Sequence, residues 1–574
     1  MAWNHTNLAL DALKSGIIFA TSLWVLLWLA ECIRNIYFHP LSKFPGPKLA
    51  AATSWWSTYQ QTIVNRSMHH ICIDLHAKYG DIVRIGPNRL HFNHPDAYSG
   101  IYRTKFDKDP FMYALLGGDG ATVTFVKHQD NKSRKDILHP FFSKSSVYNR
   151  EQLIQENIDK FCSNLVKHYE KGVSVNMSLA FRCIGLETIT SICFGKSAAC
   201  FEHEDFHSPI LESMESIVAW FMVFKHFWLV RQLILWVPEW VGLTFFKSGV
   251  AFAQMKNMFA EQIDNIRANV GKPSPDETPI IYGALTDPEN YSPVRPPPSR
   301  ASLMEEAIAL VIAGTDTTGA TMTLGTYHLC KHPEKYARLK AELKEVWPDL
   351  KGPTPTAQQL EKLPYLTSVI KEALRMAPTT TSENSRLVPP HGAKIGGAEV
   401  PGNTIVSMGV LFPMQHPWAF ETPDQYIPER WLVADEAAKQ RLDRYFVPFS
   451  KGPRSCLGIN LAWCELYLAY ANLFRRFELS LDGTKDDDFD WIDVGLALFK
   501  DAQIHILIRP IDVSLPGIRH PVEPEAPGER SAFPEGRSWQ PSQMQEFQSQ
   551  PKLAEDYHNI QGEGNFWHQG RGSE

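Results

Sequence analysis

The sequence predicts a mainly α-helical protein, a large helical body with small β-sheets that also carries an N-terminal transmembrane helix. Residues 16–33 form a continuous apolar run. Residues 151–270 and 302–376 space their apolar side chains as helices do, without the alternation typical of strands. The clearest strand signal is a short hairpin expected over residues 82–92. The composition, 44% hydrophobic and 21% charged, is typical of a globular protein with a substantial core.

The apolar run at residues 16–33 is near the lower length limit for a helix that spans a bilayer, and Glu31 is its only charge. A cleaved signal peptide is the alternative, but no small-x-small cleavage site follows the run. Arg34, Lys43 and Lys48 come directly after it, so the positive-inside rule places the rest of the chain in the cytosol. We therefore expect a single-pass membrane anchor.

Composition shifts along the chain predict four parts. Residues 1–36 are the anchor, and the prolines of residues 37–48 predict a stiff, extended hinge. Residues 49–515 form the main, catalytic domain. Residues 516–574 are rich in Pro, Gly, Glu, Gln and Ser, which predicts a disordered tail. Within the main domain, the prolines of residues 271–300 predict a long surface connection without regular structure.

The charge and cysteine content exclude several classes of protein. The net charge is −6, with 57 basic and 63 acidic side chains mixed along the sequence, so a nucleic-acid partner is not expected. The nine cysteines form no C-x-x-C pair, which argues against a zinc ribbon. Their odd number fits free thiols in a reducing compartment better than a secreted disulfide framework.

The strongest motif is F-x-x-G-x-R-x-C-x-G, formed by Phe449, Gly452, Arg454, Cys456 and Gly458. Five fixed positions make a chance match rare in a chain of this length. The motif resembles the haem-binding loop of the cytochromes P-450, which implies haem b as the cofactor and Cys456 as its axial iron ligand. We expect the other eight cysteines to be inert, buried thiols.

The residue types of this loop suit that chemistry. A thiolate ligand donates electron density to iron and favours O–O cleavage. Cys456 precedes the helical stretch at residues 461–474, whose N-terminal amides would lower its thiol pKa. Gly452 permits a tight turn, and Gly458 lacks the Cβ that would keep the helix away from a flat ligand. Arg454 offers a forked cation to a carboxylate such as a haem propionate.

A second motif, Ala313-Gly314-Thr315-Asp316-Thr317-Thr318, interrupts an apolar helical run with a glycine and three hydroxyls. Threonine and glycine lower helix propensity, so another benefit is expected to retain them. In the family that the chain resembles, the acid and the following threonine deliver protons to iron-bound dioxygen, which transfers to Asp316 and Thr317. The alternative is an ordinary core helix with a buried, hydrogen-bonded aspartate.

A third motif, Glu372-x-x-Arg375, is weak alone, because Glu31-x-x-Arg34 in the anchor matches the same pattern. Its weight comes from Pro428-Glu429-Arg430-Trp431, which resembles the family segment whose arginine completes a buried triad. The resemblance therefore implies that Glu372, Arg375 and Arg430 form a scaffold for the cysteine loop.

Two further positions are candidate contacts to the haem propionates. Arg386 occupies the place of a second propionate-binding arginine in the family. The family commonly has Trp or His four residues before an Arg in an earlier helix, whereas the same spacing here gives Asn131 and Lys135. Either Arg134 or Lys135 is therefore the expected contact from that helix.

The resemblance covers residues 40–516, with the motifs in the family's order. The anchor and hinge indicate the microsomal type in the endoplasmic reticulum membrane, and the wording FHPLSKFPGPKLA is similar to fungal, trichodiene-oxygenase-like enzymes of secondary metabolism. The implied reaction inserts one atom of O2 into a hydrophobic small molecule such as a terpenoid, polyketide or alkaloid. The pocket is expected from residues 111–125, 217–246, 379–385 and the Asp316 helix.

Electrons would come from NADPH through a separate flavoprotein reductase, or from cytochrome b5, because the chain contains no flavin or nicotinamide motif. A basic group just before the cysteine loop could steer such a partner, and it consists of Lys439, Arg441, Arg444 and Lys451. A solvated surface is the alternative reading of that group. A haem-thiolate isomerase, dehydratase or oxidative coupler, or a haem sensor or electron carrier, remain alternative functions.

Overall fold

The computed structural model describes residues 2–114, 117–218, 220–236, 247–269, 279–293, 295–499 and 503–512. All of them belong to one compact unit, Met1–Ile518. The tail predicted from residue 516 onwards lies outside the described residues, as do residues 237–246 of the aromatic stretch expected to line the pocket.

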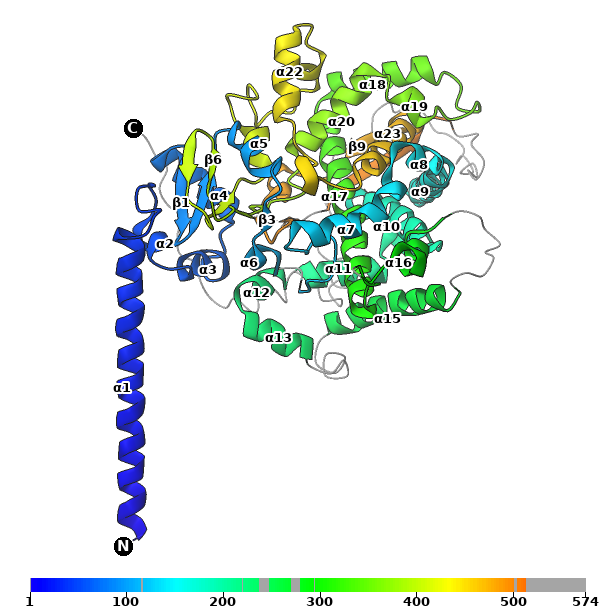
Figure 1. Ribbon diagram of the computed structural model, residues 1–574. Coiled ribbons are helices and arrows are strands. Elements are labelled where there is room, and N and C mark those ends of the chain that lie inside the picture. Colours follow the sequence, from blue (N-terminus) through cyan, green and yellow to red (C-terminus); the bar gives the residue numbers. More distant parts are fainter. Residues whose placement is uncertain are drawn as a thin grey trace, which may run out of the picture. The chain divides into compact units, whose positions relative to one another are not determined.

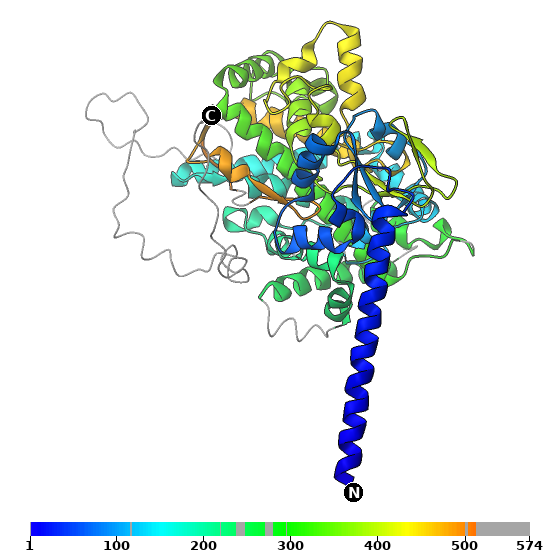
Figure 2. The ribbon, with the colours of Figure 1, turned by 90° about the vertical axis from the view of Figure 1, so that its left-hand side faces the viewer.

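The N-terminal helix α1 (Ala2–Tyr37) projects from the rest of the unit in both views (Figures 1 and 2). Its segment Leu13–Tyr37 has a mean hydropathy of 1.9 and none of its most apolar window is buried, so it is apolar enough to cross a membrane. This confirms the predicted anchor helix. Two other helices are comparably long and apolar, but they are largely buried in the protein, which identifies them as core helices.

The segment after the anchor does not form the extended hinge that its prolines suggested. Residues 38–44 form turns, and the side chain of Leu41 is fully buried. The backbone N–H of Arg84 donates to Pro45 O at 2.7 Å, and a Cβ at Gly46 would lie 2.2 Å from Arg84 O. The prolines therefore shape a compact turn that packs against strand β1.

A five-stranded sheet has the order β1-β2-β8-β5-β3. Its strands are β1 (Ile82–Gly86), β2 (Arg89–Phe92), β8 (Ile405–Ser407), β5 (Arg386–Leu387) and β3 (Asp107–Lys108). Strands β1 and β2 are antiparallel, which confirms the predicted hairpin, whereas β2 and β8 are parallel. The sheet thus joins residues that are about 300 positions apart in the sequence, and Lys108 pairs with Arg386.

Several further helices are distributed along the chain. They are α2 (Lys48–Ala52), α3 (Trp55–Thr62), α4 (Met68–Tyr79), α5 (Ala97–Tyr102), α6 (Pro110–Tyr113), α12 (Phe221–His226), α13 (Trp228–Trp236) and α21 (Leu411–Gln415). Apolar side chains of α4, α5 and the sheet, such as Ile71, Tyr98 and Val406, share a second, smaller hydrophobic core. That core supports one side of the cysteine loop through α5.

The helical body contains the largest hydrophobic core. Its long helices are α7 (His128–Leu138), α9 (Glu151–Lys171), α10 (Met177–Phe194), α11 (Pro209–Val218), α15 (Lys247–Ala268), α17 (Arg300–Lys331), α18 (Pro333–Val346), α20 (Pro364–Met376), α22 (Glu436–Tyr445) and α23 (Ile459–Arg476). Helix α17 packs against α10, α20 and α23 near the middle of the body (Figure 1). A Cβ at Gly185 of α10 would lie 2.6 Å from Gly314 O of α17, so the two helices need glycine where they cross.

Smaller elements complete the unit. They are α8 (Lys144–Tyr148), α19 (Ala357–Leu360), the sheet of β4 (Val175–Asn176), β12 (His505–Pro510) and β9 (Phe477–Leu481), and the hairpins β6 (Ala393–Ile395) with β7 (Ala398–Val400) and β10 (Trp491–Asp493) with β11 (Ala497–Phe499). The prediction that residues 271–300 lack regular structure was wrong for α16 (Ile281–Thr286). Ile281 and Tyr282 are fully buried there, because the apolar sequence between the prolines packs as one and a half turns of helix.

Candidate functional site

The cysteine loop is a tight turn that ends where α23 begins. The backbone N–H of Cys456 donates to Phe449 O at 2.9 Å and closes the turn. Gly452 has φ +75°, and a Cβ there would lie 2.2 Å from Tyr102 O of α5. Ser450 also has a positive φ of 57°. The loop therefore requires glycine at position 452, because the backbone has a positive φ there and α5 leaves no room for a side chain.

The thiol of Cys456 is accessible, although surrounding protein raises its pKa by burial. The backbone N–H of Gly458 and the charge of Lys135 act in the opposite direction and favour the thiolate. A Cβ at Gly458 would meet no protein atom closer than Cys456 Sγ at 4.0 Å. Packing within the protein does not explain this glycine, whereas a flat ligand lying against Cys456 would.

Four cations from separate elements converge near this loop, and we call them the cation group: Lys108 of β3, Lys135 of α7, Arg386 of β5 and Arg454 of the loop. Arg454 donates to Phe125 O and Val126 O, both at 2.8 Å, while its Nε is buried without a partner. Lys135 Nζ donates to Ser455 O at 2.8 Å.

The other two cations are held by neutral groups. Arg386 Nη1 donates to the Tyr113 hydroxyl at 2.9 Å, and Lys108 Nζ donates to Val123 O. The pKa of Lys108 lies well below its ordinary value because of burial and then the charges of Arg386, Arg454 and Lys135. Burial and Arg386 also lower the pKa of Arg454 to about 10.

Within the described part of the chain, no member of the cation group forms an ion pair with a carboxylate. Buried charges are ordinarily paired, because an isolated charge in a protein interior is costly. The arrangement therefore fits a ligand that brings its own carboxylates, and the two propionates of haem have that chemistry. Sequence reasoning missed Lys108, because its proximity to Arg386 depends on the pairing of β3 with β5.

The two alternatives proposed for α7 are separated by the structure. Arg134 Nη1 forms a buried ion pair with Glu306 Oε2 of α17 at 2.9 Å, and its Nη2 donates to Ser302 at 3.0 Å. The Arg134 guanidinium thus binds two side chains of α17, whereas Lys135 contacts the cysteine loop. The prediction of Arg134 as a haem contact does not fit this placement.

The Asp316 motif lies in the middle of α17. Asp316 Oδ1 accepts from Arg182 Nε of α10 at 2.8 Å. Burial raises the pKa of Asp316, and Arg182 opposes that shift. Thr317 Oγ1 donates to Ala313 O at 2.8 Å, and Ala313 is exposed although it lies in the centre of a packed helix. The aspartate is therefore hydrogen-bonded, while the face that carries Ala313 and Thr317 is open.

Glu372, Arg375 and Arg430 lie together in a buried cluster, which we call the Glu372 network. Arg375 donates to Glu372 through Nε at 3.0 Å and Nη2 at 2.9 Å, and to the backbone carbonyls of residues 414, 423 and 425. Arg430 Nε donates to Glu372 Oε1 at 3.0 Å. The indole N–H of Trp431 donates to Glu372 Oε2 at 2.9 Å, a contact that the sequence motif contains but whose role we did not predict.

Three of the segments expected to line the pocket meet in space. Met112, Val218 and Phe221 form a small apolar cluster with Val494 of the β10–β11 turn. The Thr381 hydroxyl donates to Asp493 at 2.7 Å, which joins residues 379–385 to the same turn. Sequence reasoning did not include this C-terminal turn among the pocket segments.

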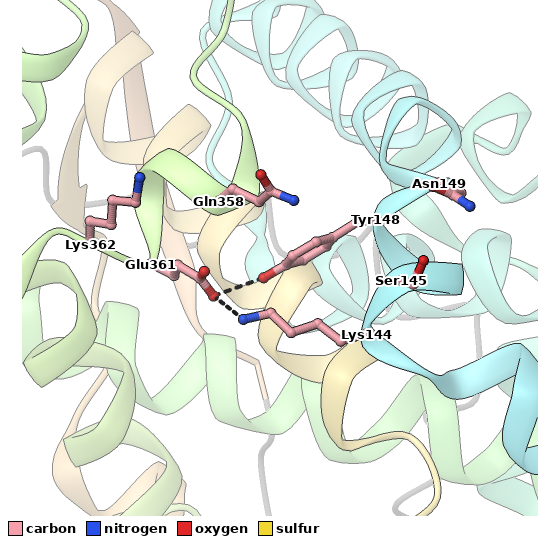
Figure 3. A pocket seen from close by; sticks show the side chains of 7 residues that line it. All are labelled: Lys144, Ser145, Tyr148, Asn149, Gln358, Glu361 and Lys362. Atoms are coloured by element: carbon pink, nitrogen blue, oxygen red, sulfur yellow. Dashed lines mark hydrogen bonds and ion pairs between the residues drawn. The ribbon is translucent and has the colours of Figure 1, made fainter.

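A groove of about 460 Å³ between α8 and α19 is lined by polar and charged side chains (Figure 3). Its lining is Lys144, Ser145, Tyr148, Asn149, Gln358, Glu361 and Lys362. Glu361 accepts from the Tyr148 hydroxyl and from Lys144 Nζ, both at 2.8 Å, so its charges satisfy one another. The groove shares no residue with the cysteine loop and does not fit an apolar substrate.

Comparison with known proteins places these features in a family. The family model described as cytochrome P450 matches residues 47–501. Cytochrome P450 monooxygenase flvC of Aspergillus flavus is 32% identical over 530 residues, covering 86% of this chain and 96% of the relative. Conidiogenone synthase PchP450 of Penicillium rubens is 32% identical over 459 residues, covering 79% and 91%. Cytochrome P450 monooxygenase TRI4 of Fusarium sporotrichioides is 29% identical over 490 residues, covering 85% and 93%.

Proposed function

The chain belongs to the cytochrome P450 family of monooxygenases, and from that premise we propose that Cys456 is the axial ligand of a haem b whose propionates meet the cation group. The cation group carries the proposal, because Lys108 and Arg386 are buried, Arg454 is half-buried, and none of the three has a carboxylate partner among the described residues. Phe449, Gly452 and Gly458 would shape the loop around the ligand. When bound, the haem iron supplies dioxygen activation, which the thiolate promotes.

We propose that Asp316 and Thr317 handle the protons of the reaction. Asp316 is half-buried, and burial raises the pKa of its carboxyl, which favours the protonated form more than in an exposed aspartate. Thr317 comes next on the open face of α17, where its hydroxyl can pass a proton from the interior of the helix toward the reacting atoms. The hydrogen bond from Arg182 keeps the Asp316 carboxyl in position.

The proposed substrate is a hydrophobic small molecule of fungal secondary metabolism, such as a terpenoid, polyketide or alkaloid. The apolar cluster of Met112, Val218, Phe221 and Val494 supports it, because these side chains join the segments expected around a pocket. The related TRI4, flvC and conidiogenone synthase are fungal proteins of similar length, which supports the same placement.

We also propose that the enzyme sits in the endoplasmic reticulum membrane with its catalytic domain in the cytosol. In addition to the anchor helix, α3 exposes Trp55, the residue Ile63 that follows α3 is also exposed, and α13 exposes Trp228, Leu229 and Leu233. Exposed apolar side chains in such numbers favour contact with lipid. An NADPH-dependent flavoprotein reductase, or cytochrome b5, would then deliver electrons from the cytosolic side.

The reduced, carbon-monoxide difference spectrum tests the haem assignment. We expect the full-length chain to give the long-wavelength Soret band of thiolate-ligated haem, and Cys456→Ser to lose that band while still binding haem. Cys464→Ser is the matched control, because this buried thiol of α23 should leave the spectrum unchanged. A folded, haem-loaded wild-type chain without the band would refute Cys456 as the ligand.

The Thr317→Ala variant tests the proton role. We expect NADPH oxidation to continue while product formation falls and the amount of peroxide rises, because protons would no longer be delivered to the oxygen at the correct step of the reaction. Thr323→Ala, on the same helix but buried against its own backbone, is the control. Tight coupling in Thr317→Ala would instead favour a haem-thiolate isomerase, dehydratase or oxidative coupler.

A further inference from the structure

One arginine bridges two carboxylates at the Asp316 site. Arg182 of α10 donates through Nε to Asp316 Oδ1 of α17 at 2.8 Å and through Nη1 to Glu215 Oε1 of α11 at 2.5 Å. The Arg182 and Asp316 side chains are 15% and 19% exposed, whereas Glu215 is 47% exposed. The bridge therefore runs from the interior acid to a carboxylate in contact with solvent.

The packing of α10 on α17 holds Arg182 in this position. A Cβ at Gly319 would lie 2.8 Å from Arg182 Cγ, so the absence of a side chain there lets the arginine stem lie across α17. Gly319 is one turn of helix after Asp316, which brings the guanidinium level with the carboxylate. Arg182 thus reaches Asp316 along a path that only glycine leaves open.

The two carboxylates compete for one guanidinium. Burial raises the pKa of Asp316, Arg182 lowers it, and Glu215 raises it again. Both acids in turn raise the pKa of Arg182. The charged groups that act on Asp316 are Arg182 from α10 and Glu215 from α11. Glu215 is the most exposed of these three groups, so it is the charge through which the surroundings act most directly on Asp316.

We propose that Glu215 is a positioning residue for the monooxygenase reaction: by drawing part of the Arg182 charge toward α11, it keeps Asp316 available to give and regain a proton. The inference rests on the proposed proton role of Asp316 and Thr317. In each cycle the O–H bond of protonated Asp316 breaks and its proton goes to the Thr317 hydroxyl, which releases its own proton to the oxygen atom that leaves as water. The Asp316 carboxylate then regains a proton from hydronium in the solvent. Removing the Glu215 charge would leave Arg182 bound to Asp316 alone and stabilise the carboxylate.

The test uses Glu215→Gln in the full-length, haem-loaded enzyme with its reductase and a turned-over substrate. We expect kcat to fall roughly three- to tenfold, because Asp316 would carry its proton for a smaller part of the time. The Michaelis constant should not change, and the solvent hydrogen isotope effect on kcat should rise. Because the donor must be protonated, the pH at which kcat declines should move to lower pH. Glu212→Gln, an exposed acid of the same helix, is the matched control.

A second readout does not depend on turnover. The carboxylic-acid infrared band assigned to Asp316, by its loss in Asp316→Asn, should disappear at a lower pH in Glu215→Gln than in the wild type. In the Arg182→Gln background, Glu215→Gln should have a much smaller effect on the band and on kcat, because Glu215 acts mainly through Arg182.

The outcomes separate the two proposals. If Asp316→Asn keeps the wild-type rate, coupling and isotope effect, the proton role of Asp316 is wrong and the inference falls with it. If Asp316→Asn slows turnover while Glu215→Gln matches Glu212→Gln in kcat and in the infrared titration, the proton role stands and the role of Glu215 is overturned.

Discussion

The Glu372 network and the cation group both bury arginines, but they differ in how the charge is neutralised. In the network, Arg375 is fully buried and makes five hydrogen bonds to Glu372 and backbone carbonyls. In the cation group, Arg386 is 4% exposed and Lys108 5%, and neither meets a carboxylate in the described residues. The charges of the first cluster are neutralised within the chain, whereas the second cluster has no carboxylate partner among the described residues.

This difference distinguishes scaffold from binding site without reference to any motif. A buried charge that loses its partner costs several kcal/mol, so a closed network is intolerant of any substitution. A group of like charges repels itself, so removing one member relieves the protein while weakening the ligand. The two clusters should therefore respond in opposite ways to the same kind of mutation.

The largest effect is expected in the closed network. Arg375→Ala leaves Glu372 buried with only Arg430, Trp431 and the backbone N–H of Ile427 as partners, and we expect a loss of about 3–5 kcal/mol of folding free energy. Purified variant should retain little haem and melt at a much lower temperature, as measured by the Soret absorbance and circular dichroism. Arg34→Ala is the internal control, because the Glu31–Arg34 pair of the anchor has the same spacing but is exposed. A normal haem content in Arg375→Ala would contradict the scaffold role.

The next largest effect on stability is expected at a buried carboxyl that has no ion pair among the described residues. Glu465 of α23 is 2% exposed, and burial raises its pKa to about 8, against hydrogen bonds from the hydroxyls of Thr188 and Thr318. Between the ordinary glutamate pKa and about 8, the folded chain keeps this proton and the unfolded chain releases it. Stability contributed by Glu465 is therefore full at acid pH and is lost as pH rises through that window, by roughly 3 kcal/mol at pH 7.

Glu465→Gln tests this sign, because glutamine keeps the hydrogen bonds and cannot ionise. The melting temperature of the variant minus that of the wild type should increase from pH 5 to pH 8 and then level off. Glu187→Gln is the contrasting control, since Glu187 is equally buried but accepts from Ser197 and from the backbone N–H groups of Ala198 and Cys200. Parallel pH curves for Glu465→Gln and the wild type would show that Glu465 is ionised in the folded protein.

The cation group should show the opposite response to loss of a charge. Lys108→Met keeps the length of the side chain and removes one of four mutually repelling cations. We expect haem to transfer to a scavenging apoprotein about tenfold faster, because one contact worth roughly 1–2 kcal/mol to a propionate is lost. The haem-depleted chain should unfold at a higher urea concentration than the wild type. If haem transfer is unchanged, Lys108 does not face the propionates.

Much of the fold could be predicted from local patterns. The anchor run, the hairpin at residues 82–92 and the long helices are properties of neighbouring residues, and the structure contains them. Residues 281–286 were predicted wrongly because proline content outweighed a short apolar sequence whose helix depends on tertiary burial of Tyr282. The hinge was misjudged for a related reason, since its turns are fixed by contacts of Leu41 and Gly46 with the body.

For the candidate site, too, local motifs could be predicted from the sequence, whereas contacts between distant segments could not. Motif spacing was enough to name Cys456, Asp316 and Arg375, because each motif lies on one loop or helix. Lys108 could not be found in this way, because only the pairing of β3 with β5 brings it to Arg386. The choice between Arg134 and Lys135 also needed the structure, since adjacent helical residues point about 100° apart. Long-range pairing, rather than residue type, was the missing information.

The same contrast between paired and unpaired cations gives the smallest expected effect, at the protein surface. Helix α22 carries Arg441 and Arg444 and projects from the body (Figure 1). Arg444 is paired with Asp96 at 2.6 Å and Lys439 with Glu436 at 3.9 Å, and Lys451 donates to the Arg444 carbonyl, whereas no ion pair of Arg441 occurs among the described residues. Arg441 is therefore the cation of the basic group that is available to steer an acidic reductase.

Charge reversal at these two arginines separates steering from structure. Arg441→Glu should slow first-electron transfer about two- to fivefold at low salt and weaken its salt dependence, with no change in melting temperature. Arg444→Glu should also slow it, but with a lower melting temperature, because it places a second acid beside Asp96. Stopped-flow reduction across a salt series measures both, with Lys344→Glu on α18 as an exposed control. If Arg441→Glu follows the control at every salt concentration, the reductase docks elsewhere and the basic group is a solvated surface.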